Sequence, residues 1–172
     1  VAGTGMVWVN NLHKDFPDYL SKKESASGES FYGKNPALAT RELSTVANKN
    51  ALRATFLVTS DEYRQPANKP DDFESAAIAK FKGDSNLAHV AGYEGATYRY
   101  TRPILVTEGC LKCHGKPEDA PKEVLEKYGD KVAFGYKVGD VRGIISVKLP
   151  SIGWKEALPI LSNPIAIALV TV

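Results

Sequence analysis

The sequence YRYTRPILVTEGCLKCH, residues 98–114, predicts a β-strand that runs directly into a group of reactive side chains. Aromatic and β-branched residues dominate its first half, which is typical of a strand. A Glu94-Gly95 turn separates this strand, predicted over residues 96–106, from another predicted over residues 89–93. We therefore expect a β-hairpin whose second strand delivers the chain to two cysteines.

The last five residues of this stretch, Cys110-Leu111-Lys112-Cys113-His114, form the pattern C-x-x-C-H. This pattern is the attachment sequence of a c-type haem, in which two cysteine sulfurs bond to the haem and the adjacent histidine binds iron. The chain has only these two cysteines, so a structural zinc site would lack its second pair of ligands. A redox-active dithiol and a strained disulfide are the remaining alternatives. The sequence therefore predicts one covalently attached haem, held by Cys110, Cys113 and His114.

The length predicts one domain of ordinary size, or one domain with terminal extensions. Of the 172 residues, 43% are hydrophobic and 24% are charged, which is enough for a hydrophobic core. The formal net charge of +2 does not indicate nucleic acid binding. Covalent haem attachment takes place outside the cytoplasm in bacteria, so we expect a periplasmic or otherwise extracytoplasmic protein. The first six residues do not resemble a signal peptide, which indicates a processed, trimmed or internal N-terminus.

Two helices and a strand are predicted before the hairpin. Apolar residues at helical spacing predict an amphipathic helix within residues 1–20, followed by a polar loop over residues 21–30. A second helix should begin at Pro36 with Asn35 as its cap. Residues 52–59 are rich in β-branched and aromatic residues and predict a strand.

A short helix over residues 73–81 precedes the hairpin in this prediction, and the C-x-x-C-H motif lies in a loop. After the motif we expect a short helix over residues 121–128. A second hairpin is predicted from strands over residues 133–138 and 142–149. Hairpins mixed with helices indicate an α+β domain, unlike the all-helical soluble cytochromes c.

Residues 157–172 carry no charged side chain. We interpret them as the start of a transmembrane helix, although they are shorter than the ~20 residues that span a bilayer; a strand or helix packed on the domain is the alternative. The predicted organisation has three parts. An N-terminal helix and loop, leaving a membrane segment, occupies residues 1–30, the haem domain residues 31–153, and the apolar tail residues 154–172.

Six stretches, in a fixed order, carry a resemblance that covers most of residues 35–150. They are NPALATR (35–41), RQPANKPDDFE (64–74), YRY (98–100), PI (103–104), CLKCH (110–114) and GYKVGDVRGIISV (135–147). Together they resemble the PAS-like c-type haem domains of bacterial chemoreceptors and histidine kinases, and related free-standing cyanobacterial haem proteins.

The resemblance implies a PAS-like antiparallel β-sheet flanked by helices, with a long N-terminal helical segment. It implies thioether bonds at Cys110 and Cys113, and His114 as the proximal iron ligand. It also makes the two apolar ends of the chain resemble the membrane attachments of a sensor. One departure is Ala39, where relatives often carry Met. Another is the absence of a third cysteine, which some relatives use as the far-side ligand.

The second axial ligand of the iron is left open by the sequence. A neutral imidazole or a thioether is needed, and the candidates are His13, His89 and Met6. A site open to water or to a small ligand is the alternative. For the haem propionates, Arg99 and Arg102 are the first hypothesis, because they lie on the strand that enters the motif and arginine pairs well with carboxylates.

Four further basic residues are reserves for the propionates, namely Arg53, Arg64, Lys137 and Arg142. The predicted function is a non-enzymatic haem sensor of redox state or of a small ligand, with a membrane-tethered monohaem electron carrier as the alternative. A haem peroxidase would need a distal acid–base pair, and none can be named. The expected partners are an electron donor or acceptor or a small diatomic ligand, a membrane, and a second copy in a homodimer.

Overall fold

The computed structural model describes residues 6–10, 16–50 and 54–151 of the chain. Over these residues the protein is an α+β fold with two antiparallel sheets and four α-helices. This confirms the predicted class and the antiparallel sheet flanked by helices. A helix begins at Pro36, as predicted. Its N-terminal cap is Asn35, whose Oδ1 accepts a hydrogen bond of 2.7 Å from Leu38 N.

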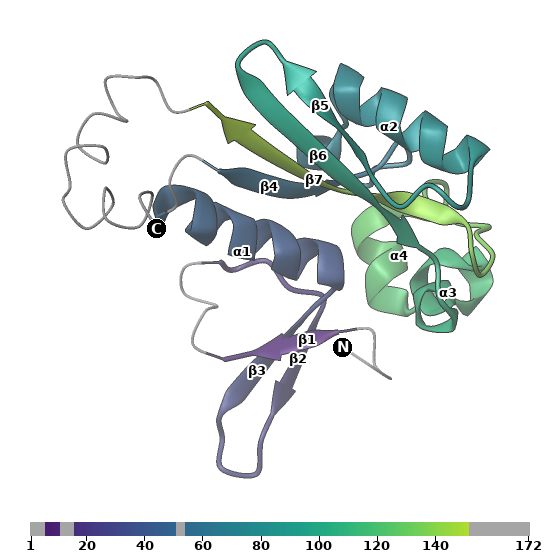
Figure 1. The fold of residues 1–172 in the computed structure, drawn as a ribbon. Coiled ribbons are helices and arrows are strands. Elements are labelled where there is room, and N and C mark those ends of the chain that lie inside the picture. Colours follow the sequence, from purple (N-terminus) through teal and green to yellow (C-terminus); the bar gives the residue numbers. More distant parts are fainter. Residues whose placement is uncertain (1–5, 11–15, 51–53, 152–172) are drawn as a thin grey trace, which may run out of the picture.

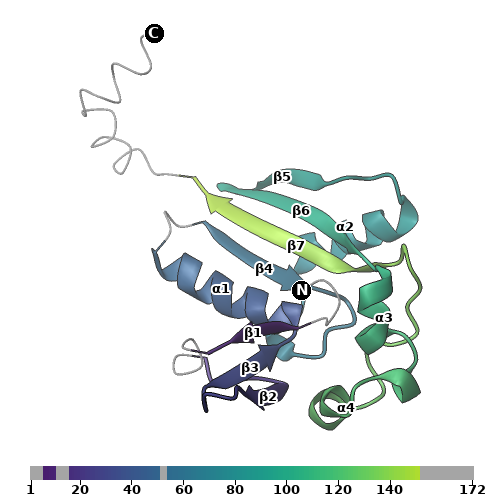
Figure 2. The same ribbon diagram turned by 90° about the horizontal axis from the view of Figure 1, so that it is seen from below.

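The main sheet has the strand order β4-β7-β6-β5. Its strands are β4 (Thr55–Thr59), β7 (Val141–Pro150), β6 (Thr97–Leu105) and β5 (Val90–Glu94). Helix α2 (Asp72–Gly83) covers one face, and helix α1 (Pro36–Asn50) lies along β4 on the other side (Figures 1 and 2). The last strand of the described chain is therefore central, between β4 and β6.

The hydrophobic core lies between α2 and β7. Its members are Ala77, Ile78, Phe81, Val141 and Ile144. Burying a large aliphatic or aromatic side chain of this kind contributes roughly 1.5–3 kcal/mol, so these residues fix α2 on the sheet. Helix α2 starts with a capping box, in which Asp71 and Glu74 each accept a hydrogen bond from the other's backbone N–H.

The predicted N-terminal helix is wrong over the described residues, which form a second sheet with the order β1-β3-β2. Its strands are β1 (Val7–Val9), β2 (Ser21–Glu24) and β3 (Ser30–Lys34). The predicted loop over residues 21–30 is thus mostly a hairpin. Gly33 of β3 explains the arrangement, because the side chains of Met6 and Trp8 occupy the space that a Cβ would need there.

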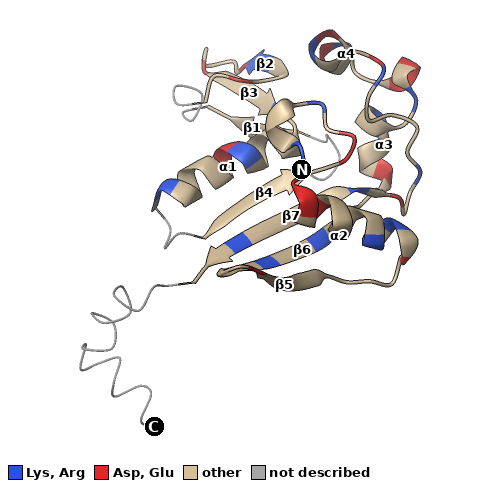
Figure 3. Ribbon diagram, turned by 90° about the horizontal axis from the view of Figure 1, so that it is seen from above, with Lys and Arg blue, Asp and Glu red and all other residues tan. Residues whose placement is uncertain are grey.

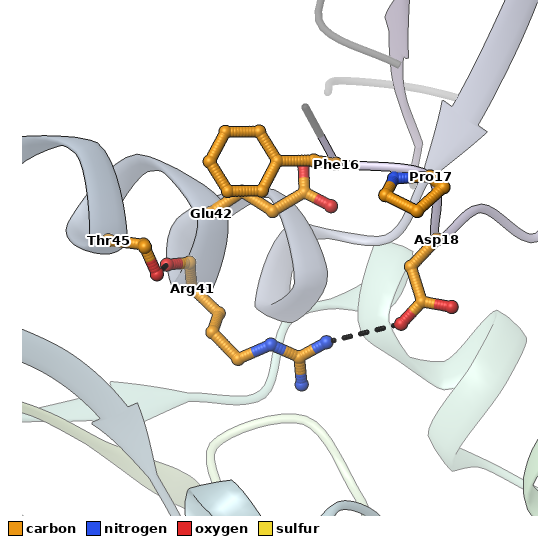
Figure 4. A pocket seen from close by; sticks show the side chains of 6 residues that line it. All are labelled: Phe16, Pro17, Asp18, Arg41, Glu42 and Thr45. Atoms are coloured by element: carbon orange, nitrogen blue, oxygen red, sulfur yellow. Dashed lines mark hydrogen bonds and ion pairs between the residues drawn. The ribbon is translucent and has the colours of Figure 1, made fainter. Parts of the chain in front are cut away.

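A buried lysine joins this small sheet to α1. The side chain of Lys34 is 1% exposed, and its ammonium donates to the carbonyl oxygens of Phe16 and Asp18 and to Glu42 Oε1 at 2.6–2.7 Å. A small hollow of about 230 Å³ lies beside this contact, and Arg41 Nη2 and Asp18 Oδ2 are 3.6 Å apart at its edge (Figure 4).

The motif and the following segment also differ from the prediction. The cysteines lie in helix α3 (Glu108–His114) and not in a loop, while helix α4 (Lys122–Tyr128) agrees with the prediction. Residues 133–138 form no strand. Gly135 N donates to Gly115 O and Tyr136 N to His114 O. This segment therefore pairs with the end of α3, whereas the predicted hairpin paired it with the strand that is β7.

Short 3₁₀ turns, η2 (Pro66–Asn68) and η3 (Pro117–Asp119), complete the described elements. No helix within the described ranges is long and apolar enough to cross a membrane. The segment on which the transmembrane prediction depends, residues 157–172, lies outside the described residues. The three-part division of the chain stays a prediction.

Candidate functional site

A cavity of about 440 Å³ opens at the end of the main sheet. Its walls are the first turns of α1, the end of β4 with the segment that follows, the start of β7, and helices α3 and α4 (Figure 2). Hydrophobic side chains from three strands, Val58, Ile104 and Ile145, contribute to its lining. The volume lies within the range of roughly 300–1,000 Å³ that is usual for cofactor sites.

Both cysteines line this cavity because α3 is a helix. Residues three apart in a helix share a face, so Cys110 and Cys113 point to the same side, and both are free thiols. Thr107 caps the N-terminus of α3. Its backbone N and its Oγ1 lie 3.4 Å and 3.3 Å from Cys110 Sγ. Burial raises the pKa of the Cys113 thiol.

The imidazole of His114 is held in one orientation. Its Nδ1 lies 2.8 Å from Ala133 O, and a carbonyl only accepts, so Nδ1 carries the proton. Nε2, on the other side of the ring, is then unprotonated, and its lone pair can bind a metal. Burial, with repulsion from Arg142 and Arg64, lowers the pKa of His114 to about 4, so the ring is neutral at neutral pH.

The carbonyl that orients His114 belongs to a residue with an unusual backbone conformation. Ala133 is buried and has φ +62°, a region that costs a non-glycine residue roughly 1–2 kcal/mol. Three hydrogen bonds hold it there. Its N–H donates to Glu62 Oε2 at 3.1 Å, and its oxygen accepts from His114 Nδ1 and from Arg64 Nη2 at 3.1 Å.

Arg64 is a structural clamp on the same side of the cavity. Its guanidinium donates to the carbonyl oxygens of Cys113, Val132 and Ala133 at 2.9–3.1 Å. It also lies over the ring of Phe134 at 4.4 Å. Arg64 therefore ties the end of α3 to the segment that orients His114.

Arg142 has a different environment. Its Nη1 donates to Ser60 Oγ at 2.6 Å, and its guanidinium lies 5.4 Å from the ring centre of Tyr136. Its Nε is buried without a hydrogen-bond partner. No carboxylate among the described residues forms an ion pair with Arg142, so this cavity-lining charge has donors left for an anion.

A family model for Tll0287-like proteins matches residues 7–150. The chain belongs to the Tll0287-like family. Among solved structures, the crystal structure of the cyanobacterial heme-protein Tll0287 is similar, with a TM-score of 0.59 and 28% sequence identity over 66% of this chain and 70% of that chain. None of the curated proteins compared with the chain matches it. The resemblance to a haem-protein family is thereby confirmed.

The structure does not place Arg99 in the lining of the cavity. Arg99 is 2% exposed, and its Nη2 donates to Asp71 Oδ2 at 2.7 Å and Glu74 Oε1 at 3.3 Å. Its Nη1 pairs with Glu94. Side chains alternate along a strand, so Arg99 faces α2, whereas Ile104 faces the cavity of this Tll0287-like chain.

The other predicted site residues are not part of the cavity lining. Arg102 shares a sheet face with Ile104 but is exposed. His89 is exposed and stacks on Tyr100 at 5.4 Å. Met6 packs over Gly33 in the small sheet. His13 lies outside the described residues.

Of the reserve residues, the structure brings Arg64 and Arg142 to the cavity, whereas Lys137 is exposed and Arg53 lies outside the described residues. Sequence reasoning missed Arg41, which lines the cavity from α1, and Ala133. Arg41 stands in one of the stretches that carry the family resemblance. Ala133 has no signal in the sequence, since its role depends on its backbone.

Proposed function

We propose that this chain is a monohaem c-type domain, in which Cys110 and Cys113 hold the haem by thioether bonds and His114 Nε2 binds the iron. One observation carries the proposal: both thiols and an imidazole with a fixed Nδ1 lie on one wall of one cavity. The solved relative Tll0287 is a haem protein, which supports the same cofactor here.

The residues of the cavity fit such a group. The hydrophobic strand residues suit the faces of a porphyrin, and Arg142 offers donors to a propionate. Bound haem supplies an iron that changes oxidation state and takes axial ligands. The chain's own contribution is to orient the imidazole through Ala133 and to keep it neutral.

We further propose that the domain is an extracytoplasmic, PAS-like sensor of redox state or of a small ligand. Helix α1 lines the cavity with its first turns and is joined to the small sheet by Lys34. A change in charge or ligation in the cavity can therefore alter the position of α1, and through it the small sheet. An electron carrier would need no such change.

Covalent attachment is tested by expressing the chain with haem-attachment machinery and denaturing it in alkaline pyridine. We expect one haem per chain, with the absorption spectrum in pyridine that is typical of a haem whose two vinyl groups are both saturated. The double variant Cys110→Ala, Cys113→Ala should lose all covalent haem, and the control Lys112→Ala, at an exposed position between them, should keep it. Haem that extracts from the wild-type chain into acidified acetone would disprove the proposal.

Sensing is tested by amide hydrogen exchange in the oxidised and reduced states. A sensor should change exchange in α1 and the small sheet by a factor of several between states. Equal exchange rates in both states, with and without carbon monoxide, would favour the membrane-tethered electron carrier.

A further inference from the structure

The wall of the cavity across from α3 is the first part of α1. In both ribbon views the N-terminal end of α1 is the end nearest to α3 (Figures 1 and 2). Five α1 residues line the cavity, Pro36, Ala37, Leu38, Thr40 and Arg41. Apart from Leu38, which lies in the first turn, their spacing places them on one face of the helix.

The chemistry of this face differs from that of the α3 wall. Pro36, Ala37 and Leu38 are apolar, and the hydroxyl of Thr40 donates to Pro36 O at 2.7 Å within its own helix. None of these five side chains has the imidazole or thioether that commonly completes a haem. Arg41 is the one cation among them, and a guanidinium donates hydrogen bonds but does not ligate iron.

The orientation of His114 directs a metal toward this face. Nδ1 points at Ala133, which belongs to the segment behind α3. Nε2 is on the opposite edge of the ring and His114 lines the same cavity as the α1 residues, so an iron held by Nε2 would lie in that cavity, within reach of groups on the α1 face.

The three arginines of the cavity divide between its two walls. Arg64 and Arg142 are on the side of His114. Arg64 donates to Cys113 O, and Arg142 lies over the ring of Tyr136, which itself packs against His114 at 6.1 Å between ring centres. Arg41 is on the α1 side. Its contact with Asp18 is 3.6 Å long, and the Asp18 side chain is 55% exposed (Figure 4). An exposed pair of this kind is worth little, so Arg41 can turn to another anion.

We propose that the α1 face leaves the second axial position of the haem to a small exogenous anion, and that Arg41 stabilises that anion by a charge-assisted hydrogen bond. This inference rests on the proposed haem function. Its ligand class follows from the charge of Arg41 and from its half-buried position, where such a bond is stronger than in water.

The test is an absorbance titration of the oxidised haem-loaded chain with azide and, separately, with neutral imidazole. Both should bind the wild-type chain and shift the Soret band. In Arg41→Leu the azide dissociation constant should rise about 10-fold or more, because a charge-assisted bond contributes ~1.5–3 kcal/mol. The imidazole dissociation constant should stay within about 2-fold, a limit of ~0.4 kcal/mol.

Arg102→Leu is the matched control, since it removes the same charge from an exposed position outside the cavity. It should change neither constant. An equal loss of azide affinity in both variants would overturn the role of Arg41, because a general effect of net charge would then explain the result.

The second experiment adds a protein ligand for the iron. Thr40→His places an imidazole on the α1 face, and we expect low-spin spectra in both oxidation states and loss of azide binding. A wild-type chain that is already low-spin and unresponsive to azide would overturn the inference. Recovery of azide binding in His13→Ala would then identify the ligand. A chain without covalent haem would instead disprove the proposed function, so the two failures are distinguishable.

Discussion

Arg99 and Arg142 lie on opposite faces of the main sheet and differ in what surrounds them. Beneath α2, the terminal nitrogens of Arg99 pair with Asp71, Glu74 and Glu94. Figure 3 shows basic positions of β6 and β7 beside the acidic start of α2. On the cavity face, the described partner of Arg142 is a neutral hydroxyl, Ser60 Oγ.

Both arginines have a buried Nε without a partner, so the difference lies in their terminal nitrogens. Three carboxylates neutralise Arg99, and Lys148 joins the same cluster through Asp71 at 2.8 Å. Arg142 keeps an unneutralised charge on a cavity wall. A satisfied charge of this kind maintains the fold, whereas an unsatisfied charge is available to a ligand.

The largest expected effect is that of Arg99→Leu. Glu74 is only 2% exposed, and loss of the partner of a buried charge costs about 3–5 kcal/mol. Urea unfolding should show a loss of that size, while the haem spectrum of the folded chain is unchanged. Arg102→Leu, at an exposed position, should cost less than about 0.5 kcal/mol. A loss below about 1 kcal/mol for Arg99→Leu would contradict a structural role for the cluster.

A smaller effect should come from the pH dependence of the same cluster. Burial alone would raise the pKa of Asp71, but hydrogen bonds from Lys148, the Glu74 N–H and Arg99 lower it below its ordinary value. A depressed carboxyl pKa contributes stability above the unfolded value of about 3.9, and that stability is lost as the pH falls through the folded value.

Urea midpoints measured between pH 6 and pH 3 should therefore decline more steeply in the wild-type chain than in Asp71→Asn. Asp119→Asn, which removes an exposed carboxylate from another region, should retain the wild-type slope. Parallel declines in all three proteins would argue against stabilisation of the Asp71 carboxylate.

On the cavity face, Arg142→Leu should give the opposite pattern to Arg99→Leu. Its effect on stability should be small, and the haem reduction potential should fall, because removal of a nearby positive charge favours the oxidised iron. A Coulomb term of about 1 kcal/mol corresponds to roughly 40 mV for one electron. Spectroelectrochemical titration measures the shift, and Arg142→Lys, which keeps the charge, should restore most of it. An unchanged reduction potential would show that the charge of Arg142 does not act on the haem.

The smallest effect is expected for Ala133→Gly. Glycine removes the strain of φ +62° but is more flexible in the unfolded chain, so the net change should stay within about 1 kcal/mol. Ala133→Val, whose branched side chain disfavours this backbone region, should destabilise the chain clearly. Thermal unfolding of the two variants measures the difference, and equal stability would show that the carbonyl is not held in this conformation.

Local patterns in the sequence predicted much of the fold. The Asn35 cap, α2, α4 and the hairpin of β5 and β6 follow from signals within a few residues of each element. Membership of a haem-protein family and the α+β class were also predicted. The residues of the motif were found because C-x-x-C-H is contiguous, and no long-range contact is needed to recognise it.

Long-range contacts account for what the sequence did not predict. Residues 133–138 pair with the end of α3, and β7 pairs with β4 and β6. In the small sheet, Met6 and Trp8 pack over Gly33, which is distant in the chain. Two of the three carboxylates that pair with Arg99 come from the start of α2, Asp71 and Glu74. They are about 25 residues away in the sequence, so the residues next to Arg99 do not reveal these ion pairs.

The central position of β7 also sets the order in which the cavity can be completed. The strand brings Arg142, Gly143 and Ile145 to the cavity, and Gly143 is needed there because a Cβ would collide with Thr59 O. Of the described elements, β7 is the last to be synthesised. Cys110 and Cys113 therefore emerge from the ribosome before the strand that completes the site around them. A growing chain presents both thiols while β4 and β6 are still unpaired on their shared side.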